Sequence, residues 1–177
     1  MPARAWIVGA ALVLVLVLAV RAVVVSSDRM REFLREAFAA RGLPPEWGEA
    51  LAAVESGGGD PDAIRSDAAN DSGPDAARGG AYGATQITIQ TARDAGFNVS
   101  AAELAASPAL QARITATIVA EGFGYQGGEP YRYGRPETFE DAAAIWNAGR
   151  PFAALPPSSS ARPYVVAAQH ALVRVTA

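Results

Sequence analysis

Glu55 is the residue of this chain that is best placed for acid–base chemistry. It ends an apolar stretch, Trp47–Val54, and is followed at once by Ser56 and three glycines. A carboxyl at the C-terminal end of a helix faces the negative end of the peptide dipole, and apolar surroundings hold its proton more tightly than water does. A carboxyl that stays protonated near neutral pH can protonate the oxygen of a sugar–sugar bond. The simpler alternative is a solvated side chain beside a turn.

The composition argues against several other chemistries. The chain has no Cys, which excludes disulfides, thiolate metal sites and a Cys nucleophile. Its single His, His170, lies in the final amphipathic run, which argues against a His metal site and against a Ser-His triad. We therefore expect no metal and no cofactor. The net charge of −3 gives no reason to expect a nucleic-acid partner.

Helix signals around Glu55 predict a small, mainly α-helical domain with long loops. Pro45 opens the helix that carries Glu55, because proline is favoured in a first helical turn. The segments Gly57–Ala81 and Gly124–Pro136 are predicted to be loops, and no segment alternates as a strand would. Further helices are predicted from Asp28 to Arg41, from Ile87 to Ala95, after the Ser100–Glu103 capping box, from Pro108 to Gly122, from Thr138 to Asn147, and from Pro163 to Leu172.

The first 25 residues are apolar enough to predict an N-terminal hydrophobic helix. As one helix, Ala5–Val25 would be about 31 Å long, close to the thickness of a bilayer core. We expect an uncleaved membrane anchor, with a signal peptide cleaved near Ala22 as the alternative. More Arg residues follow this segment than precede it. By the positive-inside rule this would keep the C-terminal part in the cytoplasm, which conflicts with export.

The predicted organisation has three parts. Residues 1–25 form a transmembrane signal-anchor or signal peptide, residues 26–44 a linker helix, and residues 45–177 the main domain. The linker helix either joins the membrane segment to the domain or packs on the edge of the domain.

Four short pieces follow one another in a fixed order, and each contains a residue that could contact a sugar. The pieces are Glu55-Ser56, Gly83-Ala84-Thr85-Gln86, Ile145-Trp146-Asn147-Ala148-Gly149 and Tyr164-Val165. Each piece alone is weakly specific, but their order and their placement at helix ends resemble the soluble lytic transglycosylase family of the goose-type lysozyme superfamily. The stretch from Asp60 to Ser66 is also similar to a segment that follows the acid in that family. The resemblance covers residues 45 to 172.

The resemblance implies a lysozyme-like helical domain that cleaves the β-1,4 bond between N-acetylmuramic acid and N-acetylglucosamine in peptidoglycan. Glu55 would be the single catalytic residue, and the products would carry 1,6-anhydro ends. The implied substrate-binding residues are Ser66, Gln86, Trp146, Asn147 and Tyr164.

The implied location is the cell envelope, where the protein would be membrane-anchored or exported to the periplasm or the cell-wall side. Its N-terminal helix would contact the membrane, and its substrate would be the peptidoglycan glycan strand. Local opening of the wall would serve a secretion or conjugation apparatus, or a bacteriophage during entry or lysis. Proteins of secretion, conjugation or virion assembly are then the expected partners, and a virion component is the alternative location.

The sequence departs from the family pattern at three places. Thr85 stands where the family usually has Met, Trp146 replaces a Tyr, and extra Asp, Asn and Gly residues are added between Ser66 and Tyr82. An added Asp could activate water, which leaves a lysozyme-type hydrolase as an alternative. A non-catalytic structural or wall-binding subunit with a degenerate site is the alternative from another class. The aromatic residues Tyr125, Tyr131 and Tyr133 are candidates for lining the glycan cleft.

Overall fold

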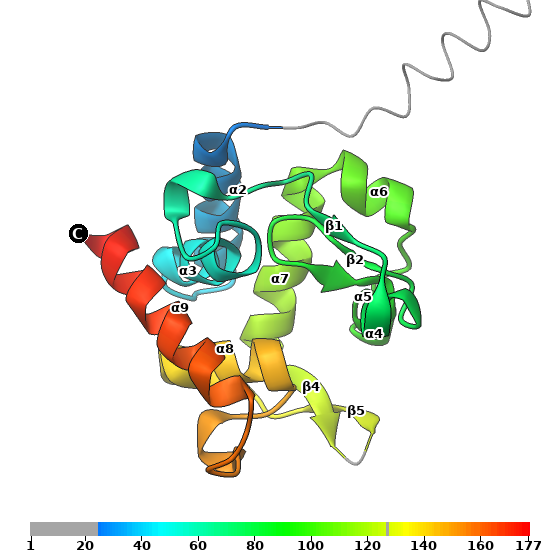
Figure 1. The fold of residues 1–177 in the computed structure, drawn as a ribbon. Coiled ribbons are helices and arrows are strands. Elements are labelled where there is room, and N and C mark those ends of the chain that lie inside the picture. The colour runs from blue at the N-terminus through cyan, green and yellow to red at the C-terminus, as the bar shows by residue number, and fades with distance from the viewer. Residues whose placement is uncertain (1–24, 127) are drawn as a thin grey trace, which may run out of the picture.

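The computed structural model describes residues 25–126 and 128–177, and these residues are mostly helical, as predicted (Figure 1). The hydrophobic helix predicted over residues 1–25 lies almost entirely outside this range. None of the helices in the described range is both long and apolar enough to span a bilayer. The long helices are α2 (Ser27–Ala40), α3 (Pro45–Ser56), α7 (Pro108–Glu121), α8 (Phe139–Ala148) and α9 (Ala161–Thr176).

Shorter elements connect these helices, and they include strands that the sequence did not predict. A three-stranded antiparallel sheet has the order β1-β2-β3, and β4 pairs with β5 as an antiparallel hairpin. The strands of the first sheet have two residues each and are too short to show alternation. The two strands of the hairpin have four residues each and lie in the segment Gly124–Pro136 and just before it, which was predicted to be a loop. The short elements are η1 (Pro61–Ala63), β1 (Ala69–Asn70), α4 (Gly73–Ala76), β2 (Ala81–Tyr82), β3 (Ile87–Thr88), α5 (Ile89–Asp94), α6 (Ala101–Ala106), β4 (Phe123–Gln126), β5 (Glu129–Arg132) and η2 (Phe152–Ala154).

The helix boundaries follow the capping signals of the sequence. The Ser100 hydroxyl accepts from the Glu103 N–H while the Glu103 carboxylate accepts from the Ser100 N–H, which forms the predicted capping box. The Thr138 hydroxyl caps α8 by accepting from the Asp141 N–H. The helix α7 ends at Gly122, which adopts a left-handed conformation with φ of 58°.

Two apolar clusters build the interior, and α7 stands between them. Ala112 and Ala116 on one face of α7 belong to the cluster formed with α2, α3, α8 and α9. Ile114 and Ile118 on its other face belong to a second cluster formed with α5, α6 and β4. Trp146 packs against both clusters, so α8 also contacts the two halves of the domain.

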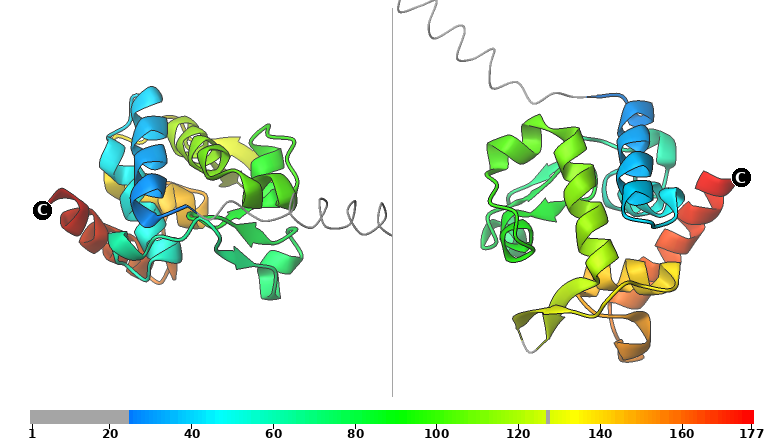
Figure 2. Two further views of the ribbon diagram at one scale, coloured as in Figure 1. Left: turned by 90° about the horizontal axis from the view of Figure 1, so that it is seen from above. Right: turned by 180° about the vertical axis from the view of Figure 1, so that it is seen from behind.

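The helix predicted as a linker, residues 26–44, is part of this core. Met30, Leu34 and Phe38 of α2 are fully buried, and α2 lies along both α3 and α7 (Figure 2). The helices α2 and α3 approach closely at Gly48, where an added Cβ would lie 2.7 Å from the Phe38 ring. The sequence boundary between residues 44 and 45 is therefore not a boundary in packing.

Candidate functional site

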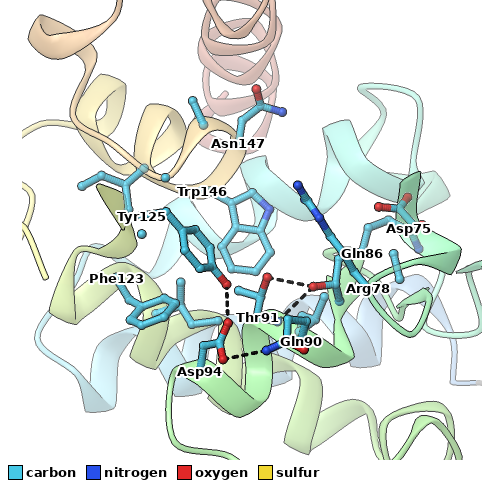
Figure 3. Close-up of a pocket in the computed structure, with 18 of the residues that line it drawn as sticks. Asp75, Arg78, Gln86, Gln90, Thr91, Asp94, Phe123, Tyr125, Trp146 and Asn147 are labelled. Carbon is cyan, nitrogen blue, oxygen red and sulfur yellow. Dashed lines mark hydrogen bonds between the residues drawn. The ribbon is translucent and has the colours of Figure 1, made fainter. Parts of the chain in front are cut away.

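The last turn of α3 carries Glu55 to the wall of a groove with a volume of about 890 Å³. Gln86, Trp146 and Asn147 line the same groove, so four of the six predicted site residues share it. Figure 3 shows Trp146 and Asn147 on α8, across the groove from Gln86 and Asp75. The other residues that line the groove are Asn70, Asp75, Arg78, Ala81, Ile87, Thr88, Gln90, Thr91, Asp94, Ile118, Phe123, Gly124, Tyr125, Gly128, Ile145, Ala148 and Gly149.

The proton on Glu55 is held unusually tightly. Burial of the carboxyl raises the pKa of Glu55 to about 7 from an ordinary value of 4.5, and the negative charge of Asp75 acts in the same direction. Hydrogen-bonding groups on Tyr164 and Trp146 oppose this shift. The Trp146 indole N–H donates to Oε1 of Glu55 at 3.1 Å. Both the protonated and the ionised form of Glu55 are therefore populated near neutral pH, and the side chain lines a groove.

Tyr164 lies behind Glu55 and does not line the groove. Its hydroxyl is buried and makes no hydrogen bond of good geometry with any described residue. It is nevertheless close enough to the Glu55 carboxyl to lower the pKa of Glu55, while burial and the Glu55 charge raise the pKa of Tyr164 well above its usual range. Tyr164 therefore influences the acid, but no contact with a ligand in the groove follows from its position.

Gln86 is held in a strained backbone conformation. Among the described residues it is the one non-glycine residue with a positive φ, 54°, and its side-chain amide donates to the Gly83 carbonyl at 3.0 Å. A residue with a Cβ avoids this region, and such strain is found preferentially at functional sites. The conformation places Gln86 on the groove wall opposite α8.

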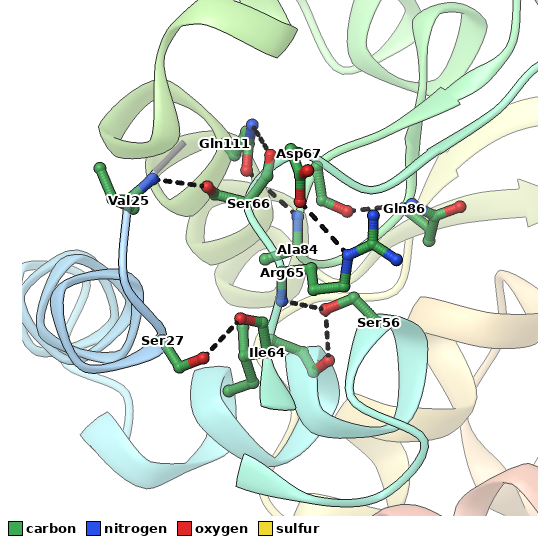
Figure 4. A network of polar contacts seen from close by, with 12 residues as sticks. Val25, Ser27, Ser56, Ile64, Arg65, Ser66, Asp67, Ala84, Gln86 and Gln111 are labelled. Carbon is green, nitrogen blue, oxygen red and sulfur yellow. Dashed lines mark hydrogen bonds and ion pairs between the residues drawn. The ribbon is translucent and has the colours of Figure 1, made fainter. Parts of the chain in front are cut away.

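A buried glutamine, Gln111 of α7, fixes the loop that carries Gln86. Its amide oxygen accepts from the Ala84 N–H at 3.1 Å, and its amide nitrogen donates to the Ser66 carbonyl at 3.0 Å (Figure 4). The amide nitrogen also donates to the Leu104 carbonyl at 2.8 Å. Gly83 makes room for it, since an added Cβ would lie 2.3 Å from the Gln111 side chain and the φ of Gly83 is +81°. The loop is thus held to α7 by a fully satisfied buried amide.

Ser66 and Thr85 belong to the interior and not to the groove. The Ser66 hydroxyl is buried and accepts from the Val25 N–H at 3.2 Å. Ser66 is absent from the groove lining, so its predicted contact with substrate has no support from its position. Thr85 is fully buried and its hydroxyl lies 2.6 Å from that of Thr115. The position at which the sequence departs from the resembled pattern therefore lies in the interior and does not line the groove.

Several polar residues of the groove were not singled out from the sequence. Asp94 of α5 accepts from the Tyr125 hydroxyl at 2.9 Å and from the Gln90 amide at 2.7 Å. Arg78 lines the groove beside them. Gln90 and Asp94 are four residues apart in a helix, which places them on the same face. This spacing is the feature of the sequence that points to them as a pair. Of the three candidate cleft tyrosines, Tyr125 lines the groove; the other two, on or after β5, do not.

No group of three or more His, Asp or Glu side chains among the described residues is arranged to hold a metal ion. No protein-family model, curated protein or solved structure matches the chain.

Proposed function

We propose that this protein is a lytic transglycosylase that cleaves the β-1,4 bond between N-acetylmuramic acid and N-acetylglucosamine in peptidoglycan. The observation that carries the proposal is Glu55, an acid with a pKa of about 7 at the wall of a groove. Such an acid is protonated often enough to donate near neutral pH, and its conjugate base is strong enough to take a proton back. The helical architecture, with an acid at a helix end, also fits the lysozyme-like fold that the sequence resembles.

The proposed reaction uses Glu55 twice. Its proton goes to the bridging oxygen as the bond from that oxygen to C1 of N-acetylmuramic acid breaks, which releases the N-acetylglucosamine end with a free 4-hydroxyl. The C6 hydroxyl of the same muramic acid then attacks C1, and its proton goes to the Glu55 carboxylate. No water is consumed, because the attacking group is tethered to the substrate. The ring closes as a 1,6-anhydro sugar and Glu55 ends protonated again.

The neighbours of Glu55 support these two proton transfers. The Trp146 N–H at 3.1 Å steadies the carboxylate after the first transfer, and the indole offers an aromatic face to a sugar ring. Gln86 and Asn147 present amide groups from the two walls of the groove, suited to hydroxyl and acetamido groups.

A hydrolase of lysozyme type is the second candidate, and Asp75 favours it. Asp75 lines the groove, belongs to the acidic insertion, and raises the pKa of Glu55 by its charge. A hydrolase needs a second carboxylate to activate water or to form a covalent intermediate. The Asn70 amide donates a hydrogen bond to the Asp75 carboxylate at 2.9 Å, which orients this side chain at the groove. The products separate the candidates, since a hydrolase leaves reducing ends.

The proposed location is the outer side of the membrane, in contact with the cell wall. The wall substrate requires this side, whereas the Arg residues after the apolar segment would by themselves favour the cytoplasmic side. The apolar residues 1–25 would anchor or export the domain, and the role would be local wall opening for secretion, conjugation or bacteriophage passage. A non-catalytic wall-binding or structural subunit is the remaining alternative.

The test is digestion of purified peptidoglycan by the full-length chain, with mass analysis of the soluble fragments. We expect fragments with 1,6-anhydro ends from the native protein and a loss of nearly all release with Glu55→Gln. Fragments with reducing ends, lost when Asp75→Asn is made, would establish the hydrolase instead. No release by the native protein, with binding to the wall retained, would support the non-catalytic subunit.

A further inference from the structure

Arg78 is the one basic residue among those that line the groove. It follows α4 in the chain, and in the view of Figure 3 its side chain extends between Asp75 and Trp146. The side chain is exposed to solvent. Burial raises the pKa of Tyr125, and the charge of Arg78 acts against this increase, so the guanidinium lies within electrostatic reach of the Tyr125 hydroxyl.

The acidic neighbours of Arg78 in the groove already have hydrogen-bond donors. Asp94 accepts from Tyr125 and from Gln90, one donor on each carboxylate oxygen. Asp75 accepts from the Asn70 amide. By contrast, no carboxylate in the described part of the chain lies within ion-pair distance of the Arg78 guanidinium, and its side chain makes no hydrogen bond there. All five guanidinium N–H donors are therefore available to a ligand.

We propose that Arg78 binds a carboxylate of the ligand that occupies this groove. The inference rests on the proposed function, in which the ligand is a peptidoglycan strand. The sugar rings of that strand are neutral. Its carboxylates are carried by the peptide where one is attached through the lactyl group of muramic acid, and by the lactyl group itself where no peptide is attached. A guanidinium matches a carboxylate through two parallel hydrogen bonds, which a neutral amide cannot reproduce. Arg78 thereby selects muramic acid units that carry a free carboxylate near the cleavage point.

The experiment measures binding of soluble glycan tetrasaccharides to the full-length chain carrying Glu55→Gln, so that no ligand is cleaved. Four ligands are compared by calorimetry at low ionic strength. One carries peptides with free carboxylates, one carries the same peptides with every carboxyl converted to a carboxamide, one has the peptides removed and the lactyl carboxylates free, and one is a neutral N-acetylglucosamine tetramer.

We expect Arg78→Gln to weaken binding of the acidic peptide ligand about fivefold or more and to leave the amidated ligand and the neutral tetramer unchanged. A loss shared by the peptide-free ligand shows that Arg78 also binds a free lactyl carboxylate, and a loss confined to the peptide ligand shows that it binds a carboxylate of the peptide alone. Arg93→Gln, at an exposed residue of α5 outside the groove lining, is the matched control and should change nothing.

Equal weakening of acidic and amidated ligands by Arg78→Gln, or no weakening of either, overturns the proposal. The outcome is separable from that of the proposed function. If the native protein releases no fragments from peptidoglycan while charge-selective binding persists, catalysis is disproved and the carboxylate site stands. If fragments are released but binding does not depend on Arg78, the catalytic proposal stands and the carboxylate site is disproved.

Discussion

At the scale of single residues, the acidity of Glu55 follows from the groups packed around its carboxyl. Burial opposes ionisation, and the charge of Asp75 adds to this effect. The Trp146 N–H and the Tyr164 hydroxyl favour the carboxylate and keep the pKa near 7. An acid that must both donate and accept a proton requires this balance.

The raised pKa of Glu55 predicts how Glu55→Gln changes stability with pH. In the unfolded chain Glu55 ionises near pH 4.5, whereas the folded protein holds the proton until about pH 7. The folded state therefore binds more protons in this window, and the native protein loses stability as the pH rises through it. The Glu55→Gln variant cannot ionise at this position and therefore does not lose this stability as the pH rises. At pH 8 its free energy of unfolding should exceed that of the native protein by at most about 3 kcal/mol, and at pH 4 the two should differ little. Urea midpoints at the two pH values measure this, and a difference that does not depend on pH would contradict it.

Tyr164→Phe should raise the pKa of Glu55 further, because its hydroxyl favours the ionised carboxyl. The alkaline limb of kcat/KM for glycan cleavage then moves to higher pH, since the protonated acid persists longer. The fold should be retained, because the Tyr164 hydroxyl makes no hydrogen bond of good geometry with the described residues. Tyr131→Phe, on the exposed strand β5, is the control. An unchanged limb in Tyr164→Phe would show that this hydroxyl does not act on the acid.

At the scale of elements, the groove wall that carries Gln86 depends on α7. Gln111→Leu should lower the free energy of unfolding by about 2 kcal/mol, because the Ala84 N–H and two carbonyls lose their buried partner. The same change should reduce glycan cleavage, since the strained backbone at Gln86 is no longer held. Gln126→Leu, at an exposed residue of the hairpin, should do neither. A loss of stability without any change in glycan cleavage would show that the loop that carries Gln86 plays no part in the reaction.

The helices could be predicted from the sequence because their signals are local. Ser100 with Glu103, and Thr138 with Asp141, cap their own helices within one turn, and Glu55 stands at the helix end that was predicted. The short strands could not be predicted, because two residues are too few to show a pattern and because pairs such as Ala69 with Tyr82 join separate segments of the chain. The interior position of Ser66 and the groove position of Arg78 depend on packing between distant segments, which local patterns do not encode.

At the scale of the whole molecule, α2 belongs to the same folded body as the helices that form the groove. Residues 45–177 without α2 should lose cooperative unfolding, because Met30, Leu34 and Phe38 are fully buried against the other helices. Each such side chain contributes about 2–5 kcal/mol, and a whole domain is stable by only about 5–15 kcal/mol. Thermal unfolding by circular dichroism compares residues 45–177 with residues 26–177, which should unfold in one transition. Equal midpoints for the two fragments would restore the linker interpretation.

The proposed function depends on one carboxyl that holds its proton near neutral pH. The direct measurement is titration of the Glu55 side-chain carboxyl carbon by NMR, assigned by its disappearance in Glu55→Gln. A midpoint of about pH 7 is predicted. A midpoint near 4.5, the ordinary value for a solvated glutamate, would contradict the proposed acid and with it the proposed function.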